Sequence, residues 1–139
     1  MVIAGHPSGW NAVSASAVGS SHRAKDTPNQ DAVATFEIDD GLCVALADGH
    51  GGPRYVRSAD GARAAVEVAR RVGTETLRRS DSLHASAVQL PARLVAGWRA
   101  EVAAHLTAHP LDADTVQLVG ADPFVAYGAT MLLLMRCKE

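Results

Sequence analysis

The sequence Leu-Cys-Val-Ala-Leu-Ala-Asp-Gly-His-Gly-Gly, residues 42–52, begins as an apolar run and ends in a glycine-rich turn. A short apolar run bounded by turn residues is typical of a buried strand. Asp48 follows the run and offers a hard oxygen ligand of the kind that Mg²⁺ and Mn²⁺ prefer. His50 carries the side chain most readily poised to move a proton near neutral pH. The stretch indicates a metal-assisted hydrolytic site, with an ordinary turn as the alternative, because Asp and Gly are also the commonest turn residues.

The residues before this strand predict its antiparallel partner. Residues 32–38 are β-branched and aromatic enough for a strand, and Asp-Asp-Gly at 39–41 is a hairpin signal. Asp31 precedes this turn by nearly as many residues as Asp48 follows it, so both carboxylates should lie at the open end of the hairpin. Their oxygens, with the carbonyl of Gly49 beside them, match the ligands of a divalent cation. Solvated turn residues are again the alternative.

The rest of the chain predicts two helices and two more strands. An alanine-rich stripe with helical spacing predicts a helix over 54–72 that Gly73 ends, and residues 74–82 should fray. A second helix is expected from about 83 or 91 to His109, where Pro110 ends it, with Leu94, Val95, Trp98, Val102 and Leu106 as its inner face. The other expectations are a flexible leader at 1–9, a strand at 10–18, a loop at 111–123 and a strand at 126–136.

The last predicted strand has no polar face. Residues 128–135 read Gly-Ala-Thr-Met-Leu-Leu-Leu-Met, and the strand at 42–47 is also apolar throughout, so both faces of each should be covered. Two helices can cover only one side of a sheet. Either a partner chain or a missing C-terminal half is therefore expected to cover the last strand.

Composition excludes several classes of protein. The chain has 139 residues, which fits one domain, and its 47% hydrophobic and 20% charged residues are ordinary for a soluble protein. The net charge of −2 gives no reason to expect nucleic acid or an acidic membrane surface as partner. Two cysteines do not form a disulfide framework, and neither a secretory signal nor an apolar run of ~20 residues is present. We therefore expect a cytoplasmic protein in a reducing compartment.

Four motifs occur in a recognisable order. They are Ser-His-Arg at 21–23, Asn-Gln-Asp-Ala at 29–32, the Asp-Gly-His-Gly-Gly of residues 48–52, and Tyr-Gly-Ala-Thr at 127–130. Over about residues 10–136 the chain resembles the metal-dependent serine/threonine protein phosphatases of the 2C (PPM) type. The resemblance implies an α+β fold, an antiparallel β-sandwich with two long helices packed on the outside of the sheet. Residues 10–139 would then be the N-terminal part of the catalytic domain, which makes the sandwich incomplete.

The resemblance also implies roles for residues of the site. Asp48 would bridge two Mg²⁺ or Mn²⁺ ions, the carbonyl of Gly49 would bind one of them, and Asp31 would hold metal-bound water. Gln30 would stand where the family usually has a metal-site Glu. A metal-activated water would attack the phosphoester, and His50 would be the general acid for the seryl or threonyl leaving oxygen. The implied reaction is dephosphorylation of phosphoserine and phosphothreonine in a protein substrate.

The chain departs from the family pattern at three points. An amide oxygen at Gln30 is a weaker ligand than a carboxylate. The phosphate-binding arginine normally precedes the aspartate by five residues, where this chain has Asp26, so Arg23 is a shifted candidate for binding the phosphate. The downstream Asp-Gly and Asp-Asn motifs are missing, so Asp31 and Asp48 supply two negative charges against the four positive charges of two ions. A centre built from this chain alone should bind metal weakly.

Two functional classes follow. The first is a protein phosphatase, a hydrolase that acts in signalling. The second is a catalytically inactive, truncated phosphatase-like module that binds a phosphoprotein or a partner chain. A third reading is an unrelated α/β domain in which the motif is a turn. His105 and His109 have the spacing of a metal pair, but a helix end that favours imidazole is the preferred interpretation.

Overall fold

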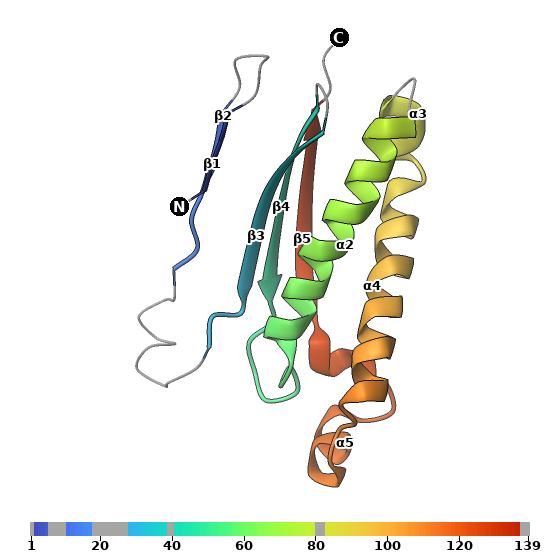
Figure 1. Cartoon of the computed structure of the whole chain (residues 1–139). Helices are drawn as coiled ribbons and strands as arrows, with labels where there is room; N and C mark the ends of the chain where they lie inside the picture. Colours follow the sequence, from blue (N-terminus) through green and yellow to red (C-terminus); the bar gives the residue numbers. More distant parts are fainter. Residues whose placement is uncertain (1, 6–10, 18–27, 39–40, 80–82, 137–139) are drawn as a thin grey trace.

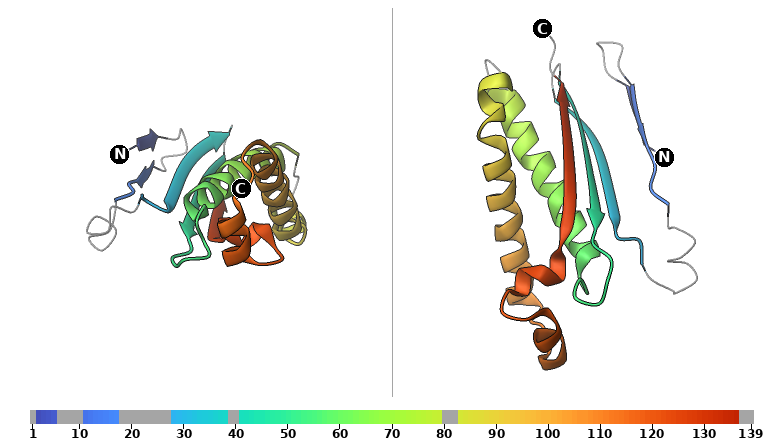
Figure 2. Two further views of the ribbon diagram at one scale, coloured as in Figure 1. Left: turned by 90° about the horizontal axis from the view of Figure 1, so that it is seen from below. Right: turned by 180° about the vertical axis from the view of Figure 1, so that it is seen from behind.

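The computed structural model describes residues 2–5, 11–17, 28–38, 41–79 and 83–136. Strands β3, β4 and β5 form a sheet in that order, and β1 and β2 form a separate two-stranded sheet. Helices α2 and α4 lie on one side of the larger sheet, and the β1–β2 pair lies beside β3 on the other (Figures 1 and 2). The elements are β1 (Val2–Gly5), β2 (Asn11–Ser14), β3 (Asp31–Ile38), β4 (Gly41–Gly49), α2 (Ser58–Arg79), α3 (Leu83–Ala87), α4 (Leu90–Ala108), α5 (Ala113–Val119), the 3₁₀ helix η1 (Pro123–Tyr127) and β5 (Ala129–Arg136).

The predicted antiparallel pair is confirmed. Strand β3 pairs with β4 from Asp31 opposite Asp48 to Ile38 opposite Gly41. The turn residues 39–40 lie outside the described part of the chain. Strand β5 pairs antiparallel with the other edge of β4, with Thr130 opposite Asp48. The central strand β4 therefore has a hydrogen-bonded neighbour on both sides. Asp31 of β3 and Thr130 of β5 both lie beside Asp48, at the same end of the sheet.

Only one face of the sheet is covered by helices. On β4, Cys43, Ala45 and Ala47 are buried against the helical layer, whereas Leu46 on the opposite face is 48% exposed. On β5, Leu132 and Leu134 are 68% and 67% exposed. The expectation that the strand at 42–47 is buried on both faces is therefore wrong, whereas one face of the last strand is left uncovered by the described residues, as expected when two helices cover only one side of the sheet. The helical face is apolar and filled, whereas on the other side the described residues place only the two-stranded β1–β2 sheet beside β3, which is not a complete second layer of a β-sandwich.

The N-terminal prediction needs correction. The leader expected at 1–9 contains strand β1, whose residues 2–5 pair with β2 from Val2 opposite Ser14 to Gly5 opposite Asn11. Residues 6–9 of that leader lie outside the description. The strand expected at 10–18 is shorter, because β2 ends at Ser14. Val2, Ile3 and Ala4 are apolar enough for a strand, and the glycines and proline nearby concealed the pattern.

Helix α2 packs through small residues onto the sheet. Ala62, Ala65 and Ala69 are at most 4% exposed and belong to the core cluster that includes Ala45 and Ala47 of β4. The expected stop at Gly73 is wrong, because the helix continues to Arg79 and Gly73 is buried within it. A Cβ at Gly73 would lie 3.3 Å from the ring of Phe36 and 3.5 Å from the sulfur of Cys43. The glycine thus permits close helix–sheet packing and does not end the helix.

Helix α4 packs onto α2 and extends the helical layer (Figure 2). Leu94 and Val102 face inward as predicted, but Val95 is 58% exposed. The indole nitrogen of Trp98 donates a hydrogen bond of 3.0 Å to the carbonyl of Gly61 in α2. None of the helices that the structure describes is long and apolar enough to cross a membrane.

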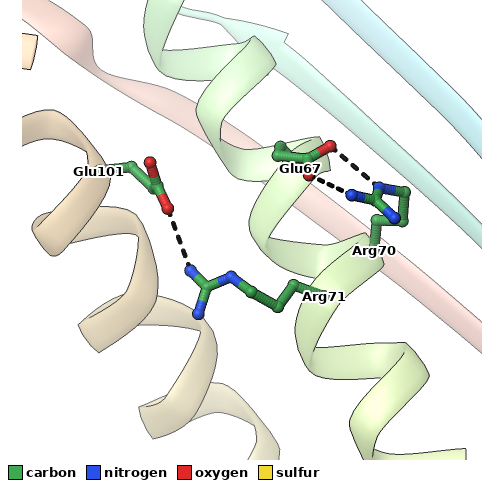
Figure 3. A network of polar contacts seen from close by, with 4 residues as sticks. All are labelled: Glu67, Arg70, Arg71 and Glu101. Atoms are coloured by element: carbon green, nitrogen blue, oxygen red, sulfur yellow. Dashed lines mark hydrogen bonds and ion pairs between the residues drawn. The ribbon is translucent and has the colours of Figure 1, made fainter.

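Ion pairs join and flank the two long helices on their outer side (Figure 3). Arg71 of α2 lies 3.2 Å from Glu101 of α4, and Arg70 donates hydrogen bonds to Glu67. The hydrogen bonds from Arg70 lower the pKa of Glu67. All four side chains are about half exposed, so solvent screening leaves each pair a small contribution to stability. Apolar contacts therefore dominate the association of α2 with α4.

The loop expected at 111–123 is mostly structured, so that prediction is wrong. Asp112 accepts a hydrogen bond of 2.8 Å from the backbone N–H of Thr115 and caps α5. Asp122 caps η1 in the same way through Phe124, at 3.0 Å. Each Asp precedes its short helix as an N-cap should. These turns return the chain to the sheet, so that β5 begins beside the glycine-rich end of β4.

The contact between α2 and η1 should make Gly61 intolerant of a side chain. A Cβ at Gly61 would lie 1.8 Å from the carbonyl oxygen of Tyr127, which requires the backbone to move. We expect Gly61→Ala to lower the free energy of unfolding by about 2–3 kcal/mol in urea titrations, despite the better helix propensity of alanine. Gly51→Ala is the matched control, because nothing lies within 4 Å of its Cβ. Equal unfolding midpoints for the two variants would contradict this packing.

The buried thiol of Cys43 should give the fold an alkaline limit. Burial raises the pKa of Cys43 from 9.0 to about 12. Below the lower value the thiol is neutral in both states, and above it the unfolded chain releases the proton more readily than the folded chain. Stability should therefore fall as the pH rises from about 9 towards 12. The difference in unfolding free energy between wild type and Cys43→Ala should shrink between about pH 8 and 10.5, and a constant difference would refute the burial.

Candidate functional site

Three polar side chains form a row across one end of the sheet. Asp31 of β3 lies directly opposite Asp48 of β4, and Asp48 lies directly opposite Thr130 of β5. Residues opposite each other in antiparallel strands project from the same face, with Cβ atoms about 4.5–5.5 Å apart. All three residues are exposed, and they line a cavity of about 470 Å³ together with residues 15–17. The two aspartates that the spacing predicted to be neighbours are thus brought together.

Gly49 sits where two backbones come close. Its N–H donates a hydrogen bond of 3.1 Å to the carbonyl of Gln30. A Cβ at this position would lie 2.8 Å from the same carbonyl oxygen and 2.9 Å from that of Ser58. Only glycine fits there without a shift. The end of β4 is therefore held between the start of β3 and the start of α2.

Gln30 ties the sheet to the first helix. Its side-chain Nε2 donates a hydrogen bond of 2.7 Å to Oγ of Ser58, which is 1% exposed at the start of α2. The side-chain amide of Gln30 is thus engaged in a contact with the start of α2. Asn29 also shapes this end, because it accepts from the N–H of Asp31 at 3.2 Å and donates to Ser16 at 2.7 Å.

His50 is held at the end of the row by two polar contacts to β5 and the residue before it. Its backbone N–H donates to the carbonyl of Gly128 at 2.9 Å. Its Nε2 lies 3.3 Å from Oγ1 of Thr130, and the tautomer decides which of the two atoms donates. The imidazole is exposed, so it can meet a solute. A residue able to transfer a proton therefore lies beside the two carboxylates.

The other predicted residues have different outcomes. Arg23 lies in the segment 18–27, outside the described residues, so its role stays a prediction. His105 and His109 stack at 4.5 Å, and His105 Nδ1 lies 2.6 Å from the hydroxyl of Tyr127. Within the described ranges, no group of three or more His, Cys, Asp or Glu side chains could hold a metal ion.

Thr130 and Tyr55 are the residues that sequence reasoning missed. Thr130 belongs to the motif at 127–130, which assigns it no role in the site, but it contacts His50 across 80 positions of the chain. Tyr55 lies within the helix expected over 54–72, but it precedes α2 and packs on the imidazole of His50. The Gly-Ala-Thr motif gave a signal for Thr130. No signal marked Tyr55, because its contact depends on the turn at 51–57.

Comparison with known proteins gives the family. The family model for protein phosphatase 2C matches residues 18–139. The chain therefore belongs to the protein phosphatase 2C family, and the resemblance carried by its motifs is confirmed. No curated protein and no solved structure gives a significant match. The matched region includes the whole row of site residues, so the site belongs to a phosphatase-type domain.

The hydrogen bond between Gln30 and Ser58 should couple the site to α2. Removing one partner leaves the other unpaired in a largely buried place, which costs about 1–3 kcal/mol. We expect Ser58→Ala and Gln30→Ala each to destabilise the fold, and the double variant to be about 1 kcal/mol more stable than the sum predicts. Urea unfolding of the four chains measures this coupling. Strict additivity would show that the two side chains do not interact.

Proposed function

We propose that this chain carries the catalytic end of a metal-dependent phosphatase that hydrolyses phosphoserine and phosphothreonine in proteins. The observation that carries the proposal is the row of Asp31, Asp48 and Thr130, with His50 at its end. The family is generally dependent on Mg²⁺ or Mn²⁺. The residues of the row are of the types that phosphoester hydrolysis requires, namely metal-binding oxygens and a proton donor.

The donor set fits a hydrated divalent cation. Two carboxylates on one face, with the Gly49 carbonyl next to Asp48 in the chain, are hard oxygen donors. Mg²⁺ and Mn²⁺ usually keep several waters, so a small number of protein ligands suffices for one ion. Bound ions supply neutralisation of phosphoryl charge and a more acidic water. The binuclear form, with Gln30 as a contributor through its side-chain oxygen, requires more negative charge than Asp31 and Asp48 provide.

His50 is proposed as the general acid. Cleavage of a phosphoserine ester leaves an alkoxide, which is a poor leaving group unless a proton reaches it. The exposed imidazole beside Thr130 can deliver that proton to the seryl or threonyl oxygen. The cavity of about 470 Å³ beside the carboxylates has room for the phosphoryl group and neighbouring atoms of a peptide. Arg23 stays the proposed phosphate-binding residue.

A second candidate function is a phosphoprotein-binding or regulatory module without turnover. Two observations support this second function. The described residues bring only two carboxylates together at the site, and Leu132 and Leu134 leave an apolar face of β5 exposed. A partner chain or further sequence of the same protein would cover that face in either case. Metal-dependent turnover separates the two functions.

Catalysis should depend on Mn²⁺, Asp48 and His50. The wild-type chain is expected to hydrolyse p-nitrophenyl phosphate and a phosphoserine peptide when Mn²⁺ is added. Asp48→Asn should abolish both activities and weaken Mn²⁺ binding in isothermal titration, because it removes one of two negative charges. His50→Ala should reduce peptide hydrolysis by about 10²–10⁴-fold, and p-nitrophenyl phosphate hydrolysis much less, because nitrophenolate leaves without protonation.

The matched control for Asp48→Asn is Asp114→Asn, which removes an exposed carboxylate from α5. It should retain wild-type turnover and Mn²⁺ affinity. Mn²⁺ binding without any turnover would favour the binding module. Turnover that persists in Asp48→Asn would exclude the row of aspartates as the catalytic centre.

A further inference from the structure

The exposed imidazole of His50 is contacted by an aromatic ring from the following turn. The rings of His50 and Tyr55 are 5.0 Å apart between centroids and nearly perpendicular, at 85°. This is the edge-to-face arrangement that aromatic pairs prefer. The Nε2 atom of the imidazole lies 3.3 Å from Oγ1 of Thr130. The hydroxyl of Thr130 and the ring of Tyr55 thus restrict the rotation of the imidazole on two sides.

Gly128 completes the packing around the imidazole. A Cβ at Gly128 would lie 2.8 Å from Nδ1 of His50, and 2.8 and 2.9 Å from two carbons of the Tyr55 ring. Both rings therefore lie against the same side of the Gly128 backbone, closer than any side chain would permit. The carbonyl of Gly128 also accepts the backbone N–H of His50. The imidazole is packed between the start of β5 and the phenol ring.

Tyr55 is itself fixed by backbone hydrogen bonds. Its N–H donates to the carbonyl of Gly52 at 3.1 Å, and its carbonyl accepts from Ser58 at 3.1 Å. The next residue but one, Arg57, donates its N–H to the carbonyl of Ala126 at 2.8 Å. Gly52 has a φ of +113°, which side-chain-bearing residues rarely adopt, and this allows the tight turn that brings the ring back over the imidazole. The phenol ring is thus a wall attached to the start of α2.

We propose that Tyr55 is a positioning residue that holds the imidazole of His50 beside Thr130, an inference that rests on the proposed phosphatase function. A proton donor must be aligned with its leaving oxygen, and small misplacements reduce rates strongly. Without the ring, the imidazole can rotate away from Thr130 into solvent. The Tyr55 hydroxyl has no hydrogen-bond partner among the residues that the structure describes. The ring, not the hydroxyl, is therefore the part that acts.

The experiment compares Tyr55→Leu with the matched variant Tyr55→Phe. Imidazole proton resonances of His50, assigned by their loss in His50→Ala, are recorded by NMR on the metal-free chain. Turnover of a phosphoserine peptide is measured with Mn²⁺. Tyr55→Leu should weaken the nuclear Overhauser effect between the His50 ring protons and the Thr130 side chain, and lower kcat by about tenfold with little change in KM. Tyr55→Phe should retain both wild-type properties, because it keeps the ring.

Several outcomes would overturn the inference. An unchanged nuclear Overhauser effect in Tyr55→Leu would show that the ring does not hold the imidazole beside Thr130, and a weakened one with unchanged kcat would show that holding it does not matter. A loss in Tyr55→Phe as large as in Tyr55→Leu would assign the effect to the hydroxyl. If Tyr55→Leu does not fold, Gly128→Ala disturbs the same packing from the residue before β5 and should weaken the same nuclear Overhauser effect. Absence of turnover in wild type would reject the proposed function, and the NMR comparison would still decide whether Tyr55 orients His50.

Discussion

The register between β3 and β4 determines what both faces of the sheet can do. The eight residues of β3 pair with β4 so that Asp31 is opposite Asp48 and Ala32 is opposite Ala47. Because side chains alternate along a strand, a slip of one residue would exchange the faces of every residue in β3. The carboxylates of β3 and β4 would then no longer meet, and polar groups would enter the layer beneath α2. The same pairing thus sets both the polar row and the apolar core.

The helical face depends on small residues at close approach. Ala45 and Ala47 on the sheet meet Ala62, Ala65 and Ala69 on α2 within one buried cluster. Because these side chains are small, helix α2 packs close to the strands. The start of α2 therefore also lies close to the end of the sheet that carries the site. Ser58 at the start of α2 reaches Gln30, and the turn before it carries Tyr55 to His50. The site is thus positioned by packing that lies behind it.

The sequence predicted the parts of the fold that local pattern determines. The Asp-Gly hairpin and the offsets of Asp31 and Asp48 were sufficient to predict the strand pair and its shared end. The helix end predicted at Gly73 is wrong, because a glycine that ends a helix and one that allows a sheet to approach look the same in the sequence. The sequence does not distinguish the short α5 and η1 from a loop, because the residues that cap them, Asp112 and Asp122, are also common in turns. The contacts of Thr130 and Tyr55 with His50 depend on tertiary register, which no local pattern contains.

The polar contacts where β5 begins have a consequence for fold specificity. Met131, Leu132, Leu133, Leu134 and Met135 are apolar whichever way they point. A shift of this strand by one residue along β4 would therefore replace one apolar face by another, and burial of apolar side chains alone could not select the native register. The bond from His50 N–H to Gly128 and the contact of its imidazole with Thr130 occur only in the observed alignment. The histidine proposed to protonate the leaving group thus also helps to define the register of a strand whose central residues are all apolar.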